Sequence, residues 1–84
     1  MPEELVGTVI HYFGKPQVAV VALEAGVGTG DVLAFRGHTT DFQQEVASME
    51  IEHGRIETAA PGSEVAIKVE ERVRKGDGVY RVTP

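Results

Sequence analysis

Apolar side chains of the β-forming type recur in short segments along this chain, and several segments alternate with a period of two, the pattern of a half-buried β-strand. Residues 5–13 are rich in Val, Ile, Thr, Tyr and Phe, and residues 32–36 form a shorter segment of the same kind. Residues 18–23 are continuously apolar, which predicts a strand that is covered on both faces or curled inside a barrel. No segment gives a convincing helical pattern.

The segment 42–52 is predicted to be one amphipathic strand, followed by an apolar strand at residues 65–69. One side of the first strand is mostly polar and carries Val46, Ser48, Glu50 and Glu52. We expect the opposite side and the apolar positions of the second strand to contribute to the core: Ala47, Met49, Ile51, Val65, Ile67 and Val69.

Turn signals separate the predicted strands at residues 14–16, 61–62 and 76–78, the last of them before a final strand at 79–82. Six or seven short strands at regular spacing predict an all-β architecture. A small closed Greek-key β-barrel is favoured, because closure protects the sheet edges of a short chain from pairing with neighbours. With 84 residues there is room for one domain, which we assign to residues 1–84.

The glycine-rich stretch at residues 24–31, EAGVGTGD, has the glycine density of a phosphate-binding loop. Its spacing is G-x-G-x-G, no Lys-Ser or Lys-Thr follows, and the next residues are strand-like instead of helical. We therefore expect this loop to join two strands, and we expect no nucleotide cofactor.

The net charge of −5 argues against a general polyanion binder, but the charge is uneven. Residues 1–65 carry three basic and ten acidic side chains, whereas residues 66–84 carry five basic and three acidic ones. The late basic residues are Lys68, Arg72, Arg74, Lys75 and Arg81. Two interpretations stay open for them: the solvated face of a strand pair, or a local patch that contacts phosphates.

Several classes of function lack the residues they need. The chain has no Cys, and its three His residues show no metal-site spacing. Ser48 or Ser63 could be combined with a His and Asp41, but no nucleophile elbow is present. No apolar run is long enough to span a membrane, and the start of the chain is acidic. We expect a cytoplasmic, non-enzymatic protein without a cofactor and without a membrane partner.

Three segments, 48–53, 60–69 and 73–77, resemble the second domain of translational GTPases of the elongation factor Tu and elongation factor one alpha type. Gly7-Thr8-Val9 resembles the opening strand of that domain, so the similarity extends over roughly residues 5–82. The same segments are similar to the C-terminal module of collagenase-like peptidases. The resemblance implies a β-barrel of the translation-factor type, here without the nucleotide-binding domain.

By this resemblance, Glu50 corresponds to a glutamate that contacts the terminal adenosine of transfer RNA, and a carboxylate can accept a hydrogen bond from a ribose hydroxyl. Val6 and Glu64 depart from the pattern, in which a basic residue and an Asn are common. The leading hypothesis is an RNA-binding module for a transfer RNA 3′ end or ribosomal RNA, with contacts from Glu50, Lys68, Arg72, Arg74, Lys75 and Arg81.

The alternative hypothesis is a protein-interaction module that docks on a larger enzyme or on its own copies. The two hypotheses differ in the surface they require. A surface that joins the late basic side chains to Glu50 would favour RNA, and a broad exposed apolar patch would favour a protein partner.

Overall fold

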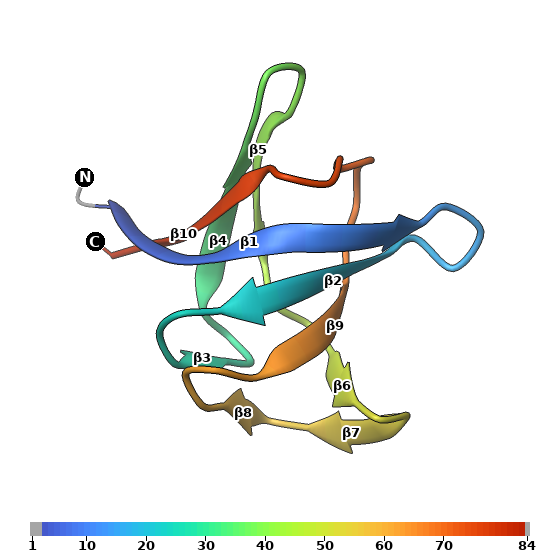
Figure 1. Ribbon diagram of the computed structural model, residues 1–84. Coiled ribbons are helices and arrows are strands. Elements are labelled where there is room, and N and C mark those ends of the chain that lie inside the picture. Colours follow the sequence, from blue (N-terminus) through green and yellow to red (C-terminus); the bar gives the residue numbers. More distant parts are fainter. Residues whose placement is uncertain (1–2, 84) are drawn as a thin grey trace.

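The computed structural model describes residues 3–83, and this range contains strands and turns and no helix. Figure 1 shows the strands wrapped around a common centre. They are β1 (Glu3–Phe13), β2 (Val18–Leu23), β3 (Val27–Gly28), β4 (Val32–Arg36), β5 (Asp41–Glu45), β6 (Met49–Ile51), β7 (Gly54–Ile56), β8 (Thr58–Ala59), β9 (Glu64–Lys68) and β10 (Gly78–Val82). The described range thus has no helix long and apolar enough to cross a membrane.

Eight of these strands form one antiparallel sheet in the order β5-β4-β10-β1-β2-β9-β6-β7, and β3 pairs with β8 in a second sheet. The long strand β1 lies in the middle, with β10 on one side and β2 on the other. The register of β1 shifts between Leu5 and Gly7 against β10, and between Val9 and His11 against β2. Such irregularities bend a strand, so β1 can take part in a curled sheet.

The connection between β5 and β6 requires strong curling. In a flat sheet the first and seventh strands would lie about 29 Å apart, from a spacing of about 4.8 Å. Residues 46–48 alone connect β5 to β6, and such a link reaches at most about 14 Å. The sheet therefore wraps around its apolar face, whose largest fully buried side chains are Phe35, Leu33, Met49 and Ile67.

The expected closed barrel of six or seven strands is wrong, because the main sheet is open and residues 3–83 form ten strands. The gap lies between edge strand β5 and the end of β9, and a side chain bridges it. Gln44 Nε2 donates to the Lys68 carbonyl (2.8 Å), and the Glu70 amide donates to Gln44 Oε1 (2.7 Å). The buried amide of Gln44 replaces a backbone ladder there.

The segment 42–52 is also not the single strand that we expected. Met49 is buried and Ile51 packs against the core, as predicted, but Ala47 is exposed and Val46 is buried. The cause is a corner in the chain: the Val46 amide donates to the Asp31 carbonyl (2.9 Å), and the Gly30 amide donates to the Val46 carbonyl (3.0 Å). Because these bonds bend the chain, the inward and outward alternation of side chains does not continue from β5 into β6.

The expected core of the β9 region is confirmed, since Val65, Ile67 and Val69 are each at most 1% exposed. The glycine-rich loop joins two strands, as predicted, although it contains a short strand, β3, that the sequence pattern did not reveal. The carboxylate of Asp31 accepts a hydrogen bond from the Gly28 amide (2.8 Å) and closes the turn into β4.

Candidate functional site

The six residues that the RNA hypothesis groups together occupy three places. Arg81 is held within the fold. Its guanidinium donates to Glu4 Oε1 (2.6 Å) and to the Gly26 carbonyl, and lies 3.8 Å from Asp31 Oδ2. This side chain ties β10 to β1 and to the loop before β3, which gives it a structural role.

Arg72, Arg74 and Lys75 lie in the loop between β9 and β10 and line a shallow hollow beside β1. All three side chains are exposed. Arg74 Nε also donates to Thr39 Oγ1 (3.0 Å), which links the loop to the β4–β5 turn. These residues form the basic loop of the molecule.

Glu50 and Lys68 lie elsewhere, on the outer face of the sheet formed by β6 and β9, where they line one hollow. The structure therefore brings Glu50 together with Lys68, and separates both from Arg81 and from the basic loop. Within residues 3–83, the five late basic side chains therefore do not form one continuous surface around Glu50.

The outer face of β2, β9 and β6 carries a different feature, a groove with an apolar floor. The side chains of Val18 and Val20 on β2 and of Ala66 on β9 form this floor and are half-buried. The hollow around them has a volume of about 310 Å³. We call it the outer-face groove.

Strand pairing places these side chains with little freedom. Ala66 lies opposite Val20 on one side and opposite Glu50 on the other, and Val18 lies opposite Lys68. Neighbouring residues Ala19, Val21, Val65 and Ile67 point the other way and are fully buried. Because side chains alternate across a strand, the firm core on one face fixes the groove residues on the other.

One end of the groove is marked by an exposed aromatic ring. Phe13 is 47% exposed, although it packs on His11 with 4.4 Å between ring centroids. Phe13 lies opposite Val18 in the β1–β2 ladder, and Pro16 of the following turn also lines the groove. The ring of Phe13 and Pro16 thus extend the apolar surface of the groove to the β1–β2 turn.

The sequence contained a signal for this floor that motif reasoning did not use. The continuous apolar run at residues 18–23 predicted a strand covered on both faces or curled inside a barrel, and in the structure one face packs on the core while the other forms the groove. Val18 and Val20 could therefore have been proposed as binding residues from the sequence.

Acidic side chains surround the floor. Glu50, Glu52 and Glu64 line the groove and are exposed. The side-chain carboxylates of these three residues form no hydrogen bond or ion pair with another of residues 3–83. Three basic groups lie near this negative charge: His53 lines the groove, Lys68 lines the adjoining hollow, and Arg55 lies opposite Glu50 in the β6–β7 ladder.

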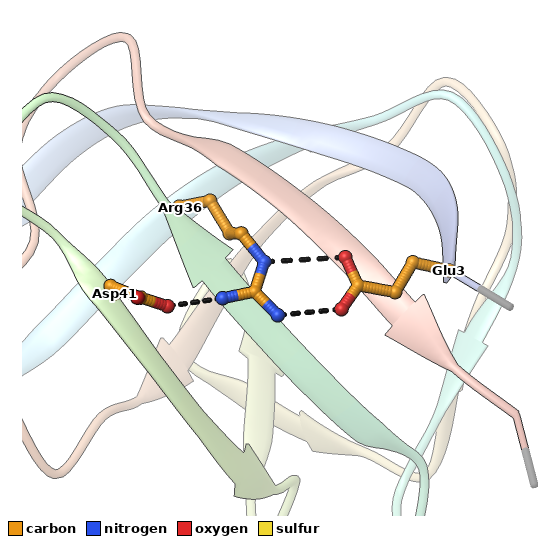
Figure 2. Close-up of polar contacts among 3 residues, drawn as sticks. All are labelled: Glu3, Arg36 and Asp41. Atoms are coloured by element: carbon orange, nitrogen blue, oxygen red, sulfur yellow. Dashed lines mark hydrogen bonds and ion pairs between the residues drawn. The ribbon is translucent and has the colours of Figure 1, made fainter. Parts of the chain in front are cut away.

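Carboxylates on the surface of β1 and β5 are paired instead. Figure 2 shows the Arg36 guanidinium held between Glu3 and Asp41, with Nη2 2.6 Å from Glu3 Oε2 and Nε 3.2 Å from Glu3 Oε1. The hydrogen bond from Arg36 lowers the pKa of Glu3, and the same bond raises the pKa of Arg36. This cluster joins β1, β4 and β5, and its exposed position gives it a modest structural role.

No cluster of His, Asp or Glu suited to a metal ion occurs within residues 3–83. His11, His38 and His53 lie on β1, in the β4–β5 turn and in the β6–β7 turn.

The architecture belongs to a class of small all-β domain that is also seen as part of larger proteins. The crystal structure of the C-terminal domain of a Geobacillus thermoleovorans protein named as a U32 peptidase matches with a TM-score of 0.89 and 23% identity, covering 95% of this chain and 93% of that one. A selenomethionine variant of that domain gives a TM-score of 0.86, with 90% and 96% covered. This likeness shows a common fold.

Similar sequences occur within longer proteins. An uncharacterized protease of Methanocaldococcus jannaschii is 37% identical over 76 residues, which are 89% of this chain and 19% of that protein. A collagenase of Porphyromonas gingivalis is 36% identical over 78 residues, which are 90% of this chain and 22% of that protein. The chain thus spans about a fifth of the length of these relatives. No protein-family model matches the chain.

These similarities support one half of the resemblance seen in the sequence and correct the other. The likeness to the C-terminal module of collagenase-like peptidases is supported by the fold match and by the names of the relatives. The assignment as a translation-factor-like, RNA-binding module is wrong, because the matched proteins are peptidases and a collagenase by name.

Proposed function

We propose that this chain, as one domain over residues 1–84, is a non-catalytic module that docks on a larger protein of the collagenase-like peptidase type. The outer-face groove is the observation that carries the proposal, because Val18, Val20 and Ala66 form an apolar floor beside the exposed ring of Phe13. Burying such a surface against a partner is favourable by about 25 cal/mol per Å² of apolar area.

The similarities give the type of partner. The fold is found as a C-terminal domain of a protein named as a U32 peptidase, and similar sequences make up about a fifth of proteins named protease and collagenase. A module of this kind has the remainder of such a protein as its natural neighbour. We propose that the groove faces that neighbour.

The test uses the Porphyromonas gingivalis collagenase from which the segment similar to this chain has been removed. Isothermal titration calorimetry of the wild-type chain should show saturable binding with a Kd of about 100 μM or tighter, equivalent to roughly −5.5 kcal/mol. Absence of binding at this level would refute docking on this type of protein.

A pair of matched variants locates the contact. Val20→Ser removes apolar floor from the groove, and Val32→Ser makes the same change at a half-buried valine on β4. Val20→Ser should weaken binding about tenfold, from the loss of roughly two methyl groups, whereas Val32→Ser should leave the Kd unchanged. Equal effects of the two variants would place the contact outside the groove.

A further inference from the structure

The floor of the outer-face groove is uneven. Val20 and Glu50 lie on either side of Ala66 in adjacent strands, and Ala66 carries only a methyl group. The floor is therefore lowest at Ala66, with an aliphatic wall from β2 and an acidic wall from β6. This shape suits a narrow aliphatic chain that ends in a cation.

The charges around the groove are unbalanced in a consistent direction. Three carboxylates, those of Glu50, Glu52 and Glu64, form no ion pair within residues 3–83, whereas Glu3 and Glu4 on β1 are paired with arginines. Lys68 lies in the same region as Glu50 without forming an ion pair with it. Arg55 lies opposite Glu50 in the β6–β7 ladder and likewise forms no ion pair with it. The residues that line the groove thus carry three carboxylates and one imidazole, and two cations that form no ion pair within residues 3–83, Arg55 and Lys68, lie at its border.

We infer that the groove binds a segment of the partner protein in which a Lys or Arg side chain is flanked by aliphatic residues. This inference rests on the proposed function and specifies the partner's chemistry. The aliphatic stem of the cation lies over Ala66 beside Val20, and its charged head reaches the carboxylates of Glu50 and Glu64. The flanking aliphatic residues cover the β2 side of the floor.

Other partner chemistries fit less well. An acidic segment would bring like charges together at Glu50 and Glu64, which disfavours binding. A purely apolar segment would strip water from the same carboxylates without supplying a replacement, and such desolvation is costly. A cation with an aliphatic stem meets both requirements of the groove.

The experiment uses two peptide probes and the isotope-labelled chain. The probes are acetyl-Leu-Arg-Leu-Arg-Leu-amide and the same peptide with Glu in place of Arg. On titration with the Arg peptide, the amide signals of Val18, Val20, Glu50 and Ala66 should shift and saturate. The Glu peptide should produce no saturating shifts at these positions.

Matched variants test the two parts of the recognition. Glu50→Gln combined with Glu64→Gln should weaken binding of the Arg peptide at least about fivefold. The control, Glu45→Gln with Glu57→Gln, removes two exposed charges outside the groove and should leave the Kd unchanged. Ala66→Leu fills the floor and should weaken binding about tenfold, whereas Ala47→Leu at the exposed corner should not. Dispersion of the amide spectrum shows whether each variant is folded.

Each failure has a separate meaning. Shifts centred on Arg72, Arg74 and Lys75, equal binding of the Glu peptide, or no effect of the two charge-removing groove changes would overturn the inference about partner chemistry. Docking on the truncated collagenase would still stand if the wild-type chain binds that protein with Val20 at the contact. Loss of collagenase binding with retained Arg-peptide binding would overturn the proposed partner and leave the groove chemistry intact.

Discussion

At the scale of single residues, the fold depends on a close approach that only glycine permits. A Cβ atom at Gly37 would lie 1.9 Å from Asp77 Oδ1, so any side chain there must displace the Asp77 carboxylate. That carboxylate is buried and accepts a hydrogen bond from the Arg74 amide (2.8 Å). Gly37 and Asp77 together fix the contact between the β4–β5 turn and the start of β10.

We therefore expect Gly37→Ala to destabilise the fold by about 1 to 3 kcal/mol, the usual cost of overpacking a tight site. Chemical denaturation monitored by circular dichroism measures the change. Gly14→Ala is the control, because the nearest heavy atom to a Cβ there is 3.7 Å away. Similar stability of the two variants would mean that Asp77 moves aside without cost.

A second prediction at this scale concerns pH. The hydrogen bond from Arg36 holds the pKa of Glu3 below its ordinary value of 4.5. A carboxylate with a depressed folded pKa stabilises the fold at pH values above its unfolded pKa, and this contribution is lost as the pH falls through the folded pKa. The stability difference between wild type and Glu3→Gln should therefore be largest near neutral pH and should shrink in acid.

Denaturation of both proteins between pH 7 and pH 3 measures this difference. Because the side chains of Arg36 and Glu3 are partly accessible to solvent, added salt should also reduce it. Glu45→Gln serves as the comparison, since Glu45 is exposed and has no ion pair within residues 3–83. A constant difference across the pH range would show that the pair seen in Figure 2 does not contribute.

At the scale of strands, the open side of the sheet depends on Gln44. Its side-chain amide bonds the Lys68 carbonyl and the Glu70 amide, and it is 7% exposed. Gln44→Ala leaves a backbone donor and a backbone acceptor without partners, at a cost of about 2 to 4 kcal/mol for the two groups. The variant should unfold at lower denaturant concentration, and the Glu70 amide should exchange faster with solvent.

Gln43→Ala provides the matched control, because Gln43 is the exposed neighbour on the same strand. It should change stability by less than about 0.5 kcal/mol. If both variants behave alike, or if Glu70 exchange is unaffected by Gln44→Ala, backbone contacts alone hold β5 near β9.

The same strands show which parts of the fold the sequence could predict. The segments that became β1, β2, β4, β9 and β10 were visible because their pattern is local, and turn residues marked their ends. Whether the sheet closes is decided by pairing over long sequence distances. Gln44 reaches residues 24 and 26 positions away, and no periodicity encodes that contact. The corner at Val46 was hidden for the same reason, since its partners are Gly30 and Asp31.

At the scale of the whole molecule, the sequence pattern predicted the apolar floor of the candidate site, but it did not predict the charge around that floor. The run at residues 18–23 indicated a strand covered on both faces or curled inside a barrel. The choice of which carboxylates remain unpaired depends on Arg36 and Arg81, which reach Glu3 and Glu4 across 33 and 77 positions. Folding thus pairs two arginines with carboxylates outside the groove, while Arg55 lies opposite Glu50 without an ion pair to it.

The arrangement of the whole molecule also determines where a second protein can be inserted without blocking the groove. Glu3 pairs with Val82, so the start of β1 lies beside the end of β10, as Figure 1 shows. Phe13, which borders the groove, lies at the opposite end of β1, about 30 Å from Glu3 along the strand. The turn at residues 14–17 therefore lies beside the groove, and the β4–β5 turn lies at another side of the molecule.

We expect a folded protein inserted through flexible linkers after Lys15 to weaken binding of the Arg peptide at least about tenfold, because it would stand over the floor at Pro16 and Val18. The same protein inserted after His38, in the exposed β4–β5 turn, should leave the Kd within about twofold, the error of such a comparison. Both insertions interrupt exposed turns between paired strands, so their effects on folding are comparable and circular dichroism can verify them. Peptide binding that survives insertion after Lys15 and is lost after His38 would place the binding surface on the side of β4 and β5.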